Sequence, residues 1–195
     1  MAGPGVIMTL TFAPLVIAVF FSAKFGAAVE ILRWICLGTM LQVITWPMGF
    51  IIVAKGRQNV LFCCEAAWAA VSLGLAWVCV RSFGLNGAGI AFFGSYVFHA
   101  FLIYPVVNRL SGFRWNRDNL RTARMFLFLI ALVFSGFHML PFAWAASLGT
   151  LSVVGSGIYS FRVLSRLVSL DQLPHALQRL LARLGFVSSS PVTVT

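Results

Sequence analysis

Long stretches without a charged residue are the feature that most limits what this chain can fold into. A run of about 20 apolar residues is long enough to cross roughly 30 Å of bilayer hydrocarbon as a helix. The chain contains several such runs, and 61% of its 195 residues are hydrophobic whereas only 9% are charged. Because a soluble domain carries roughly 25% charged residues, we predict an all-α membrane protein.

These runs divide the chain into about six candidate transmembrane helices. The predicted spans cover residues 5–22, 34–54, 60–80, 88–108, 125–140 and 142–161. The last two belong to one uncharged block, which we divide at residues 138–141 because Pro141 favours the first turn of a new helix and disfavours a helix interior. We therefore predict a transmembrane bundle over residues 1–163.

The basic residues lie between the apolar runs and are shared unequally among the connections. One set of alternate connections holds Lys55, Arg57 and the arginines within residues 109–124 and 162–183, whereas the other set holds Lys24, Arg33 and Arg81. Connections rich in Lys and Arg remain in the cytoplasm, so both termini are predicted to be cytoplasmic. The net charge of +10 is thus explained by membrane orientation, and no nucleic-acid partner is expected.

The segment after the last span has a different pattern. Leucines recur every three or four residues from Leu164 to Leu184, and the arginines lie largely on the rest of the helical wheel. This pattern predicts a cytoplasmic amphipathic helix over residues 164–186, interrupted at Pro174 and bound to anionic lipid. The alternative is a solvated tail. Residues 187–195 are short and polar, and we expect them to be disordered.

Residues for catalysis or metal binding are scarce. No hydrolase triad, phosphate-binding glycine loop or pair of catalytic acids can be found, and the chain has 4 acidic residues in all. The cysteines, Cys36, Cys63, Cys64 and Cys79, form no CxxC motif and have no histidine cluster near them. We interpret them as packing residues, with a redox role for the adjacent pair as the alternative. We expect no enzyme activity, no cofactor and no metal.

Polar residues at membrane depth are costly and therefore suggest function. His99 falls near the middle of the fourth predicted span, close to the bilayer midplane. Gly87, Ala91, Ser95 and His99 recur at every fourth position, so one face of this helix is small and polar. Two interpretations remain open: His99 contacts a cavity or substrate, or it is a buried histidine hydrogen-bonded to another helix.

The second and third predicted spans offer further polar groups. Gln42, Thr45 and Trp46 lie near the middle of the second span and precede Pro47, which predicts a kink. Kinked helices line transporter cavities but also occur without any transport role. Glu65 is expected at the start of the third span, where it would complement the helix dipole and pair with Lys55 or Arg57, with a gating role as the alternative.

Residues 9–115 resemble O-antigen translocases of the polysaccharide flippase family, within the superfamily that includes multidrug and toxic-compound exporters. The resemblance is carried by the phrases APLVIAVFFSAKF (residues 13–25), ILRWICLGTMLQVITWPMGFIIVAKG (31–56), FCCEAAW (62–68) and GLNGAGIAFFGSYVFHAFLIYP (84–105). It implies a two-lobed bundle in the bacterial inner membrane that moves undecaprenyl-pyrophosphate-linked oligosaccharide by alternating access. With about six spans, the chain matches one lobe, and we expect it to be an N-terminally truncated C-terminal lobe.

The same resemblance implies membrane lipids, a polysaccharide polymerase and the chain-length machinery as partners. The candidate residues of the substrate path are His99, Gln42, Trp46, Tyr96, Lys24, Arg33, Arg81, Lys55, Arg57 and Glu65. A pyrophosphate and a glycan need a hydrated, cationic path, which is why basic residues near the span ends are included. The alternatives are a multidrug or cation antiporter of the same superfamily, a membrane-embedded transferase or polymerase, and a remnant that does not transport.

Overall fold

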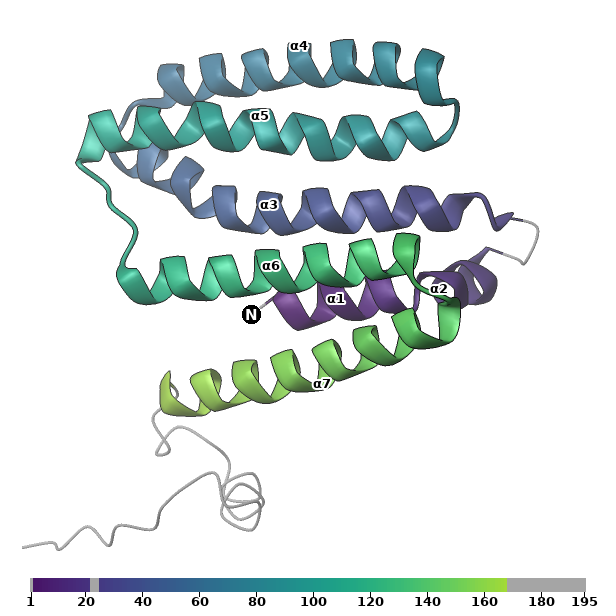
Figure 1. Cartoon of the computed structure of the whole chain (residues 1–195). Helices are drawn as coiled ribbons and strands as arrows, with labels where there is room; N and C mark the ends of the chain where they lie inside the picture. The colour runs from purple at the N-terminus through teal and green to yellow at the C-terminus, as the bar shows by residue number, and fades with distance from the viewer. Residues whose placement is uncertain (1, 22–24, 168–195) are drawn as a thin grey trace, which may run out of the picture.

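The computed structural model describes residues 2–21 and 25–167, which form seven α-helices and no strand (Figure 1). The helices are α1 (Gly3–Thr11), α2 (Ala13–Phe20), α3 (Ala28–Ala54), α4 (Gln58–Phe83), α5 (Asn86–Ser111), α6 (Arg117–Met139) and α7 (Phe142–Leu167). Helices α3 to α7 are each long and apolar enough to cross a membrane. The all-α prediction is confirmed for the described residues, and the five long apolar helices are consistent with a multi-pass membrane protein.

The first predicted span differs from the structure. Instead of one helix over residues 5–22, the chain forms α1 and α2, which are bent by 77° at Phe12. Pro14 lies in the first turn of α2, where its ring would clash with the carbonyl of Leu10 if one helix continued through it. The segment is a broken span or a re-entrant loop, so the described residues contain five spans, or six if the bent pair counts as one.

The long helices extend beyond the predicted spans at most of their ends. Helix α3 begins at Ala28 rather than at residue 34, and α6 begins at Arg117 rather than at residue 125. The predicted spans were limited by charged residues, whereas helices continue past the hydrocarbon while their charged side chains extend toward the headgroups. Helix α7 includes Leu164–Leu167, and the rest of the predicted amphipathic helix and the tail lie outside the described residues.

Close approach between helices explains how the centre of the bundle is packed. Helix α5 lies between α3 and α4 (Figure 1). Gly38 of α3 faces the ring of Phe92, and Gly89 of α5 faces Trp34 and the backbone of Ile31. A Cβ atom on Gly89 would lie 2.8 Å from the Trp34 Cβ atom and 3.0 Å from the Ile31 carbonyl oxygen. Small residues let helix backbones approach in membranes, where no hydrophobic effect drives their association.

Two apolar clusters anchor the two halves of α3. One cluster joins α3, through Cys36, Leu37 and Met40, to α1 and α6. The other joins Met48 and Ile52 of α3 to α5. Residues 41–47 of α3, including Pro47, connect the buried residues of the two clusters, and Ile44 among them packs against the first cluster. The C-terminal part of the helix turns away from its first part (Figure 1). The segment between the two packed regions is where the candidate site lies.

The basic connections share one end of the bundle. Figure 1 shows the α3–α4 turn, the α5–α6 connection and the C-terminal end of α7 at the same end, with the α4–α5 and α6–α7 turns at the other. The first set carries Lys55, Arg57 and Arg114, as the charge pattern requires. Which end faces the cytoplasm, and where both termini lie relative to the membrane, remain predictions.

Candidate functional site

Each of α3, α4 and α5 contributes a pair of side chains about one turn apart to a single cavity. Residues separated by three or four positions lie on the same face of a helix, so each pair presents two neighbouring groups. The six lining residues are Gln42, Trp46, Glu65, Trp68, Tyr96 and His99. The cavity has a volume of about 250 Å³, slightly below the roughly 300–1,000 Å³ of typical small-molecule pockets.

Two ionisable side chains, those of His99 and Glu65, contact each other in this cavity. The Nε2 atom of His99 lies 3.4 Å from the Oε1 atom of Glu65. The two side chains differ in exposure, at 7% for His99 and 48% for Glu65. A protonated imidazole would form an ion pair with this carboxylate, whose other side stays accessible from the cavity mouth.

Aromatic rings form a wall around the histidine. The Trp68 ring centroid lies 5.8 Å from that of His99 and 5.4 Å from that of Tyr96, and the Tyr96 and His99 rings meet edge to face. Such tilted geometries are the favourable ones for aromatic pairs. The rings fix the orientation of one another, so the cavity has a defined shape although its polar groups are not hydrogen-bonded to one another.

Buried polar atoms without hydrogen-bond partners are the most informative feature of the cavity. Both ring nitrogens of His99 and the indole Nε1 of Trp68 are buried, and none has a hydrogen-bond partner among the described residues. A buried donor or acceptor left unsatisfied costs about 1–3 kcal/mol. The contact of His99 with another helix is the approach of its Nε2 atom to Glu65 of α4, at 3.4 Å, which does not have hydrogen-bond geometry. Both interpretations of His99 made from the sequence stay open. The atoms are disposed to bind water or a polar ligand.

The chemical groups of the cavity suit a ligand rich in hydroxyl groups. Glu65 supplies an acceptor, Trp68 a donor, and His99, Gln42 and Tyr96 can do either. Aromatic faces beside such groups can cover the carbon–hydrogen faces of a ring. No cluster of three or more potential metal ligands occurs within the described residues.

The structure brings together His99, Gln42, Trp46, Tyr96 and Glu65 from the predicted path. Sequence reasoning missed Trp68, which completes the cavity from α4. A usable signal was present, because Trp68 lies three residues after Glu65 and three-residue spacing places both on one face. Trp68 was noted only as part of a family-like phrase.

The expected environment of Glu65 is wrong in two respects. Helix α4 begins at Gln58, so Glu65 lies about two turns inside the helix and not in the first turn, where it could complement the dipole. The basic side chain that it contacts is that of His99, not that of Lys55 or Arg57. Helix α4 begins before the predicted span of residues 60–80, which places this carboxylate further inside the helix than expected.

Arg33 belongs to a different cluster. Its Nη1 atom lies 2.6 Å from Glu30, which His138 of α6 approaches to 3.6 Å on the other carboxylate oxygen. The guanidinium group also lies 4.1 Å from the centroid of the Phe137 ring. These contacts tie the beginning of α3 to the end of α6, so Arg33 has a structural role away from the cavity.

The remaining basic candidates also lie away from the cavity. Arg81 lies over the Trp77 ring of its own helix, and Lys55 and Arg57 are exposed at the α3–α4 turn, more than two turns beyond Trp46. Lys24 lies outside the described residues. The cavity itself is therefore polar and aromatic, with one carboxylate and no lysine or arginine in its described lining.

Comparisons of the chain with protein-family models, curated proteins and solved structures gave no match. The fold and the cavity together define the class as an all-helical protein with five helices able to cross a membrane and a polar cavity lined by three of them.

Proposed function

We propose that this chain takes part in moving a lipid-linked oligosaccharide, of the undecaprenyl-pyrophosphate type, across the bacterial inner membrane. One structural observation carries the proposal: His99 and Trp68, whose buried nitrogen atoms have no hydrogen-bond partner among the described residues, line a cavity midway along the long apolar helices. Polar groups at that depth are costly and often mark the path or binding site of a solute. The resemblance of residues 9–115 to O-antigen translocases supports the same assignment.

The division of labour follows from the chemistry of the substrate. Glycan hydroxyl groups would hydrogen-bond Glu65, His99 and Trp68, while the lipid tail stays in hydrocarbon. Lys55 and Arg57, at the basic end of the bundle, would attract the pyrophosphate before the glycan enters. The cavity accommodates a small part of an oligosaccharide at a time, so it acts as a contact point along a path.

Complementation in a strain that lacks its own O-antigen flippase tests the proposal. The 195-residue chain should restore surface O-antigen, and Trp68→Ala and His99→Ala should each lower export at least about tenfold with unchanged protein abundance. Leu73→Ala truncates an exposed side chain on the same helix as Trp68 and serves as the matched control. Failure of the unaltered chain to export any glycan would contradict the proposal, as would equal export by all variants.

A cation or drug antiporter is a second candidate, which one observation favours. Glu65 is an acid at membrane depth with an imidazole 3.4 Å away, and antiport relies on intramembrane carboxylates that exchange protons or sodium. Under this alternative, Glu65→Gln abolishes ion-driven drug efflux from vesicles and leaves O-antigen export in the complemented strain unchanged. Under the flippase proposal the export defect is found and drug efflux is absent. A transferase or polymerase would instead act on lipid-linked sugar in detergent.

A further inference from the structure

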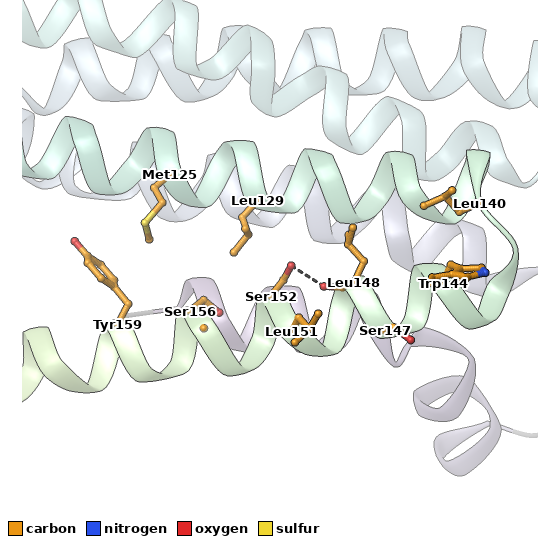
Figure 2. Close-up of a pocket in the computed structure, with 11 residues that line it drawn as sticks. Met125, Leu129, Leu140, Trp144, Ser147, Leu148, Leu151, Ser152, Ser156 and Tyr159 are labelled. Carbon is orange, nitrogen blue, oxygen red and sulfur yellow. Dashed lines mark hydrogen bonds between the residues drawn. The ribbon is translucent and has the colours of Figure 1, made fainter.

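A second cavity lies far from the polar one, between α6 and α7 (Figure 2). These helices meet at the turn containing Pro141 and diverge toward the basic end of the bundle (Figure 1). The resulting space has a volume of about 750 Å³. We refer to it as the α6–α7 groove.

The lining of the groove is apolar. Figure 2 shows Met125 and Leu129 of α6 directed toward α7, and Leu148 of α7 directed toward α6. Leu140 and Trp144 line the end near the turn. These side chains offer contact to hydrocarbon and little to a polar ligand.

The hydroxyl groups of the lining already have partners. Ser147 and Ser152 each donate to the carbonyl oxygen four residues earlier, at 2.8 Å, and Ser156 donates to the Val153 carbonyl at 3.1 Å. The Tyr159 hydroxyl lies 3.3 Å from that of Thr122 on α6. Because each hydroxyl is satisfied within the protein, a ligand in this groove needs no hydrogen-bonding groups of its own.

Arginine side chains lie near the end of the groove that Tyr159 lines. Arg121 is exposed and lies four residues before Met125, so it continues the same face of α6 by one turn. Arg162 is also exposed and follows Tyr159 by three residues on α7. An apolar groove that ends between arginines is complementary to a molecule with a hydrocarbon chain and an anionic head.

The dimensions favour a single chain over a helix. From Met125 to Leu140 the groove follows α6 for about 22 Å, which exceeds half of a roughly 30 Å hydrocarbon core. A lipid chain of one leaflet can lie along this length. A helix is about 10 Å across and would be stopped where α6 and α7 converge.

We propose that the α6–α7 groove binds one anionic phospholipid of the surrounding bilayer, with an acyl chain along Met125 and Leu129 and its phosphate beside Arg121. This site is independent of the polar cavity and of the proposed transport function. The anionic leaflet attracts basic side chains at the membrane surface, so the end occupied by Arg121 is where such a head group is concentrated.

Gly155 provides a direct way to fill the groove. It lines the cavity, and a Cβ atom added to it meets nothing within 4 Å. The substitution Gly155→Leu should therefore occupy lipid space without disturbing α7. Gly157 on the same helix also has open space around an added Cβ atom but does not line the groove, so Gly157→Leu is the matched control.

Native mass spectrometry of the full chain in detergent, with added phosphatidylglycerol or phosphatidylcholine, measures occupancy. We expect one phosphatidylglycerol to be retained per chain. Gly155→Leu should weaken retention by at least roughly tenfold, since the leucine displaces two or more methylene groups and each changes a binding constant about fourfold. Gly157→Leu should bind like the unaltered chain.

A second variant tests the head-group end. Arg121→Gln should lower the preference for phosphatidylglycerol over phosphatidylcholine by roughly fivefold while both lipids still bind. Three results would overturn the proposal: equal retention by Gly155→Leu and Gly157→Leu, equal binding of the two lipids to the unaltered chain, or a lipid-free dimer that only Gly155→Leu dissociates. The last would identify the groove as an interface between two copies.

Discussion

The polar cavity and the α6–α7 groove lie in the same helical bundle but differ in how their polar atoms are hydrogen-bonded. In the polar cavity, His99 and Trp68 bury nitrogen atoms that have no hydrogen-bond partner among the described residues, although one of them lies 3.4 Å from Glu65. In the groove, Ser147 and Ser152 satisfy their hydroxyls on their own helix. The number of polar residues is therefore a poor guide to what a membrane cavity binds, and the state of their hydrogen bonds is a better one.

Bonding within the helix explains the difference. A serine hydroxyl lies close enough to its helix to donate to a carbonyl one turn earlier. The His99 imidazole and the Trp68 indole form no such bond on their own helices, so they depend on a neighbouring helix or a ligand. The hydroxyl groups of the groove are thus hydrogen-bonded within the protein, and the groove suits hydrocarbon. The buried nitrogen atoms of the cavity gain hydrogen bonds only when a polar ligand or water enters it.

The largest expected effect distinguishes the tight packing around the cavity from the open groove. Gly89→Leu should lower the free energy of unfolding by about 3 kcal/mol, because its side chain meets the Ile31 backbone and Trp34. Gly155→Leu should leave it unchanged or raise it by up to about 1 kcal/mol, since a helical glycine is replaced where space is free. Chemical unfolding in detergent measures both. Similar losses of unfolding free energy in the two variants would contradict the difference in packing between the cavity region and the groove.

A second prediction concerns which end of the bundle faces the cytoplasm, and therefore in which leaflet each region lies. In a cysteine-free background, Asn86→Cys should react with an impermeant thiol reagent added outside the cell roughly tenfold faster than Trp115→Cys, because basic connections remain inside. Lysis should make the two rates comparable, which controls for local reactivity. The opposite order in intact cells would reverse the topology and move Arg121 to the outer leaflet.

A smaller effect is expected on stability at His99. His99 has no hydrogen-bond partner among the described residues, and its contact at 3.4 Å is with a half-exposed carboxylate, that of Glu65. His99→Leu should therefore change the free energy of unfolding by less than about 1 kcal/mol. Ile103→Val, one turn further along α5 in a packed cluster, should cost about 0.5–1.5 kcal/mol. Thermal unfolding of both variants provides the comparison. A loss of several kcal/mol in His99→Leu would indicate that the histidine is structural.

The smallest effect is expected within the groove. Ser152→Ala removes a hydroxyl bonded only to its own helix, and such bonds contribute little to helix stability. The free energy of unfolding should change by less than about 0.5 kcal/mol, and phosphatidylglycerol retention should stay the same. A clear loss of lipid in this variant would show that the lining supplies a hydrogen bond after all.

Much of the fold could be predicted from where charges are absent, because a bilayer requires long apolar helices. The turn between α6 and α7 could be placed from Pro141 alone. The break at Phe12 was missed because the apolar run was judged by charge, although Pro14 interrupts it. Charge pattern reports on hydrophobic length, whereas a break in a helix depends on local backbone chemistry.

The candidate site was predictable to the extent that depth in the membrane identifies costly side chains. His99 and Gln42 were found in this way. The contact between His99 and Glu65 depends on how α4 and α5 are aligned, and the Glu30–Arg33–His138 cluster on how α3 meets α6. The sequence of one helix does not determine how it aligns with another. The contacts between helices could therefore be identified only from the structure.

Helix α4 is packed mainly against α5 and is otherwise little buried. Two walls of the polar cavity are thus set in tightly interlocked helices, while the third wall, which carries Glu65 and Trp68, is held from one side only. Small rotations of α4 about α5 would widen or narrow the polar cavity at little cost in free energy. Ligands of different widths could then enter without disturbing the packing of the other helices.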